Sequence, residues 1–208
     1  MSKSSRQLDR RSFFRRTGKA LGGAALTWSA VGGYAAFRGA PAAHSGMRGR
    51  LGLLRPPGAG DEPDFLSKCI RCTRCSDACE AQCILLFGPE AGALQGTPYI
   101  IPEDHACTLC LECGAACPTE ALGELEDRTD VRIGVAVVDE RLCVSHNGTG
   151  VCGACHTACP LKNEAITQDF RNQPTVHANK CVGCGLCEEV CIVKDRKAIQ
   201  VMSERVQV

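Results

Sequence analysis

Apolar residues downstream of residue 65 occur in short runs, not in long amphipathic segments. Runs rich in β-forming residues predict three short strands, at residues 97–101, 131–138 and 174–177. Other short runs, each ending in an apolar pair, predict short helices at residues 119–122, 161–166 and 193–199. The pattern therefore predicts a repeating unit of strand, loop, short helix and strand. A unit of this size cannot bury a core alone, so the units are expected to pair.

A mild apolar stretch at residues 21–37, diluted by glycines, follows a strongly basic N-terminus. The hexapeptide RRSFFR at residues 10–15 matches the core of a twin-arginine signal, and the small residues APA at 40–42 suit a signal peptidase. Residues 1–43 are therefore predicted to be a twin-arginine signal peptide for export to the periplasm, with an uncleaved membrane anchor as the alternative. Residues 44–64, rich in Pro, Gly and Arg, are predicted to be a linker.

The composition indicates that something other than side chains fills the core. Aromatic residues make up only 4% of the chain, whereas 17 of its 208 residues are cysteine, all between Cys69 and Cys191. A domain of this size normally depends on aromatic and large aliphatic burial. Because the excess of basic charge is confined to the N-terminal arm, the chain lacks the basic footprint of a nucleic-acid-binding protein.

Sixteen of the cysteines form four motifs that begin 38, 36 and 38 residues apart, which is the regular period of an internal repeat. Motifs one, two and four have the spacing C-x2-C-x2-C-x3-C, and motif three is stretched by an eight-residue gap after its first cysteine. The members of motifs one to four in turn are Cys69, Cys72, Cys75 and Cys79; Cys107, Cys110, Cys113 and Cys117; Cys143, Cys152, Cys155 and Cys159; and Cys181, Cys184, Cys187 and Cys191.

This spacing is typical of [4Fe-4S] clusters, for which one loop supplies three thiolates and the fourth cysteine binds the other cluster of a pair. Zinc sites separate their C-x2-C pairs by a dozen residues or more, and a disulfide framework disperses its cysteines, so both fit less well. We therefore expect the sixteen cysteines to bind four [4Fe-4S] clusters. Cys83 is left over, either as a small buried thiol or as an alternative ligand, because Glu80 and not proline follows Cys79.

Two pairings of the motifs are compatible with the sequence. Sequential pairing, one with two and three with four, is favoured because both pairs share the 38-residue offset. Nested pairing, one with four and two with three, stays open because proline follows the fourth cysteine only in motifs two and three, as Pro118 and Pro160. These prolines suit the first position of a helix.

The expected fold is α+β, with two ferredoxin-like modules of short β-hairpins, cysteine loops and short helices at residues 65–128 and 129–208. If four thiolates hold each cluster, no iron has an open position for a substrate. The five histidines are scattered, and no phosphate-binding loop is present. We therefore expect an electron carrier and not an enzyme.

Beyond its cysteine motifs, the chain resembles the NapG/MauM group of periplasmic ferredoxin-type proteins over most of residues 8–200. The twin-arginine start, the segments GTPY at 96–99 and GVAVVDERLC at 134–143, and the stretched motif ending in Cys159-Pro160-Leu161 carry the resemblance. It implies electron transfer from a membrane quinol-oxidising protein to a periplasmic redox enzyme, with peripheral membrane association. Alternatives are a fixed electron-transfer subunit of a molybdenum-type reductase and a disulfide- or zinc-stapled binding module.

Overall fold

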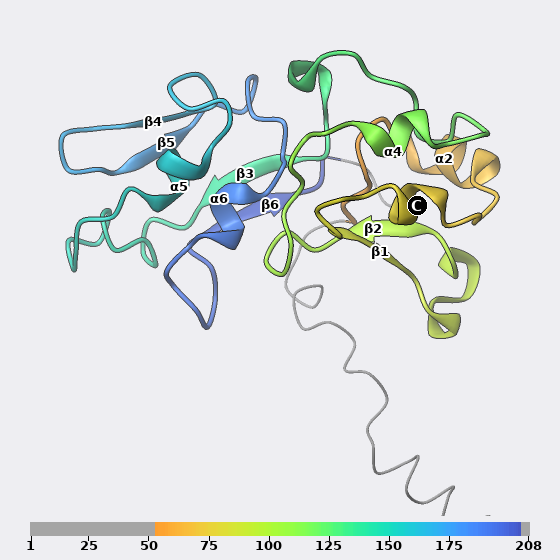
Figure 1. Ribbon diagram of the computed structural model, residues 1–208. Helices are drawn as coiled ribbons and strands as arrows, with labels where there is room; N and C mark the ends of the chain where they lie inside the picture. The colour runs from red at the N-terminus through yellow and green to blue at the C-terminus, as the bar shows by residue number, and fades with distance from the viewer. Residues whose placement is uncertain (1–52, 205–208) are drawn as a thin grey trace, which may run out of the picture. The chain divides into compact units, whose positions relative to one another are not determined.

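Short helices, short strands and turns make up the computed structural model, which describes residues 53–204 (Figure 1). The predicted signal peptide, residues 1–43, and the beginning of the predicted linker lie outside the described residues. The α-helices are α2 (Glu62–Lys68), α3 (Arg74–Asp77), α4 (Glu112–Ala115), α5 (Ala154–Ala158) and α6 (Leu186–Glu189), with the 3₁₀ helices η2 (Pro89–Leu94) and η3 (Arg128–Asp130). The strands are β1 (Ile84–Leu86), β2 (Pro98–Ile100), β3 (Val135–Val138), β4 (Ile166–Gln168), β5 (Pro174–Val176) and β6 (Ile199–Met202). None of the helices within residues 53–204 has the length and apolar character needed to cross a membrane.

The strands form three antiparallel pairs, β1 with β2, β4 with β5, and β3 with β6. The first two pairs are local hairpins, whereas β3 and β6 lie 60 or more residues apart in the sequence and run side by side in Figure 1. The β3–β6 pair therefore joins the beginning of the C-terminal half (residues 129–204) to its end. Helix α6 packs against β6, and the buried carboxylate of Glu188 accepts a hydrogen bond of 2.7 Å from the Val201 N–H. Small sheets and few helices make this an α+β fold.

The linker predicted at residues 44–64 is wrong for its second part. Leu54 and Arg55 are fully buried, and α2 begins at Glu62. The Leu54 carbonyl accepts a hydrogen bond from Ile100 N–H, and the Gly58 carbonyl accepts one from Gly123 N–H. Ala59 of this segment forms an antiparallel bridge with Leu122. The segment thus joins the beginning of the N-terminal half (residues 53–128) to its end, as β3 does in the C-terminal half by pairing with β6. Backbone hydrogen bonding places it in the fold, and its Pro and Gly content conceals this.

The strands predicted from the apolar runs are present, but the predicted helices are wrong. Residues 119–122, 161–166 and 193–199 contain turns and the starts of strands but no helix. The helical turns α3, α4, α5 and α6 lie instead around the third cysteine of each motif, before the fourth. Pro118 and Pro160 consequently occupy turns and not the first position of a helix. After the fourth cysteine the chain reverses direction toward a strand or bridge, which leaves no room for a helix.

Cysteines are a large part of the core. One buried cluster runs through both halves and contains Cys79, Cys83, Cys107, Cys113 and Cys184 among aliphatic side chains. The halves also meet through the backbone, because the Cys107 N–H donates a 2.9 Å hydrogen bond to the Cys184 carbonyl. The thiol-rich loops thus lie inside the fold, where side chains alone do not fill the space.

Candidate metal centres

The cysteine loops have a backbone conformation that ordinary residues rarely adopt. In motifs one, two and four, the residues two and four positions after the first cysteine have positive φ: Arg71 and Thr73, Leu109 and Leu111, and Gly183 and Gly185. Successive residues of this kind turn N–H groups toward a common point and form a concave anion site. In motif two, the Leu109 N–H accordingly donates to the Cys107 sulfur at 3.4 Å. Four of these six residues are not glycine, and they are held in the left-handed region of backbone conformation that favours glycine. Their conformation costs energy that some other interaction must offset.

The motifs lie against one another in sequential order, one with two and three with four. Helix α3 packs on α4, and α5 packs on α6. In three places four thiols line one cavity, and in each the fourth thiol comes from the partner motif. We name these cage one (Cys69, Cys72, Cys75, Cys117), cage three (Cys143, Cys152, Cys155, Cys191) and cage four (Cys181, Cys184, Cys187, Cys159). The remaining walls are mainly apolar, with Phe65, Leu86 and Leu122 in cage one and Ala136, Ile166 and Val201 in cage four.

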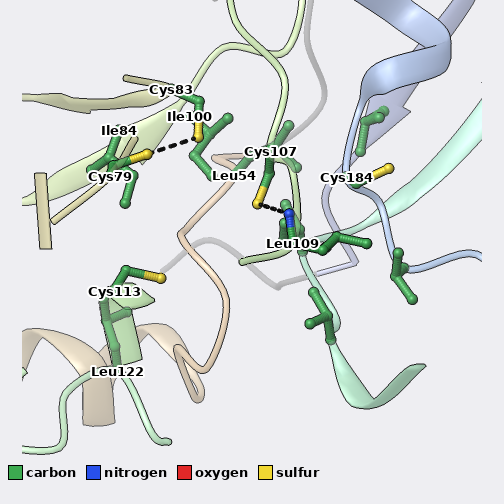
Figure 2. Packing of buried hydrophobic residues seen from close by; sticks show 14 of the residues in the cluster. Leu54, Cys79, Cys83, Ile84, Ile100, Cys107, Leu109, Cys113, Leu122 and Cys184 are labelled. Carbon is green, nitrogen blue, oxygen red and sulfur yellow. Dashed lines mark hydrogen bonds between the residues drawn. The ribbon is translucent and has the colours of Figure 1, made fainter. Parts of the chain in front are cut away.

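We give the name cage two to Cys107, Cys110 and Cys113 together with Cys79 and Cys83, because members of this group interact electrostatically. Burial, with the charges of Cys107 and Cys110, raises the pKa of Cys113 to about 12. Interaction with the Cys83 thiol lowers the pKa of Cys107 to about 7, while the same interaction and burial raise the pKa of Cys83. Cys79 lies with its Sγ 3.5 Å from the Cys83 Sγ. Figure 2 shows both sulfurs on the side of Cys107.

Backbone N–H groups favour thiolate at the exchanged position of cage one. Burial opposes ionisation of Cys117, but the N–H groups of Leu122, Thr119 and Ala121 outweigh it and lower the pKa of this thiol. The Leu122 nitrogen lies 3.5 Å from the Cys117 sulfur. In cage four, the Ala136 N–H donates to the Cys181 sulfur at the same distance. Donors of this kind stabilise negative charge on sulfur and help set the potential of an iron–sulfur centre.

The stretched loop of motif three is closed at its base by Ser145. This buried hydroxyl accepts a hydrogen bond from the Cys152 N–H at 3.0 Å and donates one to the Cys152 carbonyl at 3.1 Å. Asn147 caps the loop by accepting from the Thr149 N–H and hydroxyl. The eight-residue gap after Cys143 is therefore a structured excursion that returns Cys152 to cage three.

The cages suit a cluster better than one metal ion. Within residues 53–204, no three His, Cys, Asp or Glu side chains converge closely enough to hold a single ion. Zinc draws four ligands to bonds of about 2.3 Å or less, whereas a core of four irons and four sulfides keeps its thiolates farther apart. All seventeen cysteines are free thiols.

An orphaned donor also fits a sulfide-containing group. The Gln168 Nε2 is buried and has no hydrogen-bond partner in the described part of the chain. It lies 3.4 Å from the point where Gly153 would carry a Cβ atom, between Cys152 and Cys155. A buried amide donor without an acceptor is rare and calls for an explanation. An additional acceptor beside motif three, such as a cluster sulfide, supplies one.

Comparisons with known proteins agree with this geometry. The 4Fe-4S dicluster domain matches residues 68–121 and again residues 149–194. The ferredoxin-type protein NapG of Escherichia coli (strain K12) is 37% identical over 97% of this chain and 89% of its own length. The chain belongs to the NapG/MauM family of ferredoxin-type proteins. The methylamine utilization ferredoxin-type protein MauM of Methylorubrum extorquens is likewise 37% identical, over 76% of each chain. This NapG/MauM protein is therefore an iron–sulfur electron-transfer protein with 4Fe-4S centres.

Three residues around the cages were not found from the sequence. Ser145 and Gln168 lie in loop and strand positions where polar residues are ordinary. Arg55 is fully buried, pairs with Glu62 and donates to Thr97 Oγ1 at 2.9 Å. Its guanidinium lies 4.6 Å from the ring centre of Phe65, a wall residue of cage one. The GTPY segment at 96–99 was noted in the sequence, and it contains the two acceptors of Arg55, Thr97 Oγ1 and the Pro98 carbonyl.

Proposed function

We propose that the chain holds four [4Fe-4S] clusters and relays single electrons between a membrane quinol-oxidising protein and a periplasmic redox enzyme. The observation that carries this proposal is the exchange of the fourth thiol between partner motifs in cages one, three and four. The N-terminal and C-terminal halves would then be two dicluster modules. The sixteen motif cysteines are the proposed ligands, with Cys79 as the fourth thiolate of cage two by analogy with the other motifs.

When bound, such clusters supply one-electron oxidation and reduction and no open iron site for a substrate. The chain's own part is to hold the cages, exclude water with apolar walls and direct N–H groups at sulfur. A fully cysteine-ligated cluster carries a net double negative charge at the half-reduced level. Donors such as the Leu109 and Leu122 N–H groups offset part of this charge.

Contacts between cages give the proposed path an order that differs from the order in the sequence. Cage one adjoins cage two, because α3 packs on α4 and the Cys75 charge raises the pKa of Cys113. Cage two adjoins cage four through the hydrogen bond from Cys107 to Cys184. Cage four adjoins cage three, because α5 packs on α6 and the Cys155 charge helps to raise the pKa of Cys187. Electrons would therefore pass in the order one, two, four, three or its reverse.

The ends of this path face solvent where apolar side chains flank thiols. Cys72 in cage one is exposed beside Ile70, which is 63% exposed. Val151 and Ile192 flank Cys152 and Cys191 of cage three and are 78% and 58% exposed. These are the proposed contact points for the donor and the acceptor. The MauM relatives are named for methylamine utilization, which makes that system a source of candidate partners.

Anaerobic purification followed by iron and acid-labile sulfide analysis tests the cluster count. We expect about 16 of each per chain. A value near 12 would leave one cage empty and contradict the four-cluster proposal, and a zinc protein or a disulfide-linked one would contradict electron transfer itself. Stable co-purification with a large catalytic chain would replace the carrier role with that of a fixed subunit.

Export is tested on the full-length chain in a bacterial host. Replacing the pair Arg10 and Arg11 with lysines should retain the loaded protein in the cytoplasm, while the unaltered chain reaches the periplasm. The matched control replaces Arg15 and Arg16 with lysines, so that it makes the same two substitutions, with no change of net charge, but leaves the Arg10-Arg11 pair intact. Equal export of both variants would contradict the twin-arginine assignment.

A further inference from the structure

Cage two comprises five thiols, whereas each of the other cages has four. Cys107, Cys110 and Cys113 come from motif two, and Cys79 and Cys83 lie in the segment after α3. The Cys83 sulfur lies 3.5 Å from the Cys79 sulfur, and the Cys83 thiol interacts with Cys107. Figure 2 shows the Cys79 and Cys83 sulfurs facing one another across the turn.

The turn after Cys79 is built so that Cys83 returns to the cage. The Gln82 N–H donates to the Cys79 carbonyl at 3.0 Å, and Gln82 has a φ of 51°. Cys79, Cys83 and Cys107 are then 8%, 3% and 6% exposed.

Motif two contains the same turn without the extra thiol. Glu120, three residues after Cys117, has a φ of 56°, as Gln82 has three residues after Cys79. Ala121 therefore holds the position in motif two that Cys83 holds in motif one, and it is equally buried at 5%. The comparison isolates the thiol as the feature that distinguishes the two turns.

We propose that Cys83 is an alternative to Cys79 as the fourth ligand of cage two. Either cysteine can then complete the coordination of the cluster held by Cys107, Cys110 and Cys113. The inference rests on the proposed function, because it requires a cluster in cage two. Cys83 lies in the apolar core, but its sulfur is also 3.5 Å from the sulfur of Cys79, the thiol it would replace. The absence of proline after Cys79 leaves Glu80 and Ala81 free to adjust when the ligand changes.

The test compares Cys79→Ala, Cys83→Ala and the double variant, each in the full chain purified anaerobically. A cluster with three thiolates has one labile iron, and one-electron oxidation by ferricyanide followed by the loss of one Fe²⁺ leaves a three-iron cluster with its own EPR signal. Both single variants should keep about 16 irons through this treatment, while the double variant falls to about 15 and gains the three-iron signal. Cys117→Ala, whose turn carries Ala121 in place of a spare thiol, is the matched control and should behave like the double variant.

A three-iron signal in Cys79→Ala as strong as that in Cys117→Ala would overturn the inference. So would a Cys79→Ala and a Cys79→Ser chain that both fail to accumulate with clusters while Cys83→Ala accumulates, since Cys79 would then be irreplaceable. Iron content of the unaltered chain separates the two proposals. An iron content well below about 16 in the unaltered chain counts against the four-cluster function. If the unaltered chain has its full iron content but Cys79→Ala loses iron on oxidation, the result counts only against the role of Cys83.

Discussion

At the scale of single residues, burial favours the protonated form of several cage thiols when no iron binds them. Burial raises the pKa of Cys75 to about 11 and, with smaller charge effects, that of Cys184 to about 12, against an ordinary value of 9.0. N–H donors act in the opposite direction at Cys117. Iron therefore has to displace protons from buried thiols such as Cys75 and Cys184, and the free apoprotein keeps these protons.

The raised pKa values predict an alkaline weakness of the apoprotein. Between pH 9 and about 11 to 12 the unfolded chain has lost thiol protons that the folded chain retains. The stabilisation is thus fully present below pH 9 and is lost as the pH rises through the folded values. The melting temperature of reduced, chelator-treated protein, followed by circular dichroism, should fall more steeply over this window than that of the loaded protein, whose thiolates carry no proton. Parallel curves for the two forms would contradict this expectation.

Arg55 supports cage one without touching a thiol. Its guanidinium is fully buried between Glu62, Thr97 and the Pro98 carbonyl, to which it donates at 2.6 Å. Arg55→Met leaves Glu62 without its partner and should lower the free energy of unfolding by about 3–5 kcal/mol. Denaturant unfolding of the loaded protein measures the change.

The exposed pair of Lys68 and Asp64 offers the matched control, because Lys68→Met removes an ion pair of 2.8 Å in solvent. This loss should cost less than about 1 kcal/mol. A second variant, Arg55→Met with Glu62→Met, should recover part of the stability. Equal effects of Arg55→Met and Lys68→Met would show that burial of the pair is unimportant.

At the scale of elements, the turn after the fourth cysteine is a module that motifs one and two share. Gln82 and Glu120 have the same left-handed conformation, and the segments lead to Ile84 of β1 and to the Leu122 bridge. Leu122 and Ile84 both enter the core. Because the two turns are equivalent, a cysteine at position 121 of motif two should be able to take the ligand role proposed for Cys83.

Ala121→Cys should therefore give cage one a spare thiol. In the Cys117→Ala background, a cysteine at 121 should restore resistance to iron loss on ferricyanide oxidation, measured by the three-iron EPR signal. Ala121→Ser in the same background controls for size and should leave the cluster vulnerable. A Cys117→Ala/Ala121→Cys chain that loses iron as readily as Cys117→Ala would show that the turns are not equivalent.

The sequence predicted three of the six strands in the described residues and the sequential meeting of the motifs, because β-branched runs and fixed cysteine spacing are local signals. It did not predict the helical turns, since segments such as 193–199 have helical composition but must reverse toward β6. It also missed residues 54–59, whose place beside Gly123 and Ile100 depends on backbone hydrogen bonds over long sequence distances. Ser145 and Arg55 were missed for a related reason, because their partners are defined only after the chain has folded.

At the scale of the whole molecule, the two halves meet where electrons would cross between cages two and four. The Cys107–Cys184 hydrogen bond lies at this junction, and the next residue, Gly185, has a φ of 85°. A Cβ atom on Gly185 would lie 2.2 Å from the Cβ of Pro102 in the N-terminal half. Glu189 of the C-terminal half adds a contact of 3.4 Å to the Ala106 N–H. One backbone hydrogen bond and the close contacts of Gly185 and Glu189 thus keep these two cages adjacent.

Gly185→Ala should push the halves apart at this junction and slow electron exchange between cages two and four several-fold. Gly148→Ala is the matched control, because Gly148 has a φ of 75° but nothing lies within 4 Å of its Cβ position. Both changes carry the backbone strain of about 1–2 kcal/mol, so any greater loss of stability in Gly185→Ala measures the clash. Rapid photoreduction followed by absorbance and freeze-quench EPR would give the exchange rate in chains that retain full iron content. If Gly185→Ala matched Gly148→Ala in both stability and rate, the path between the halves would have to run elsewhere than through the Cys107–Cys184 junction.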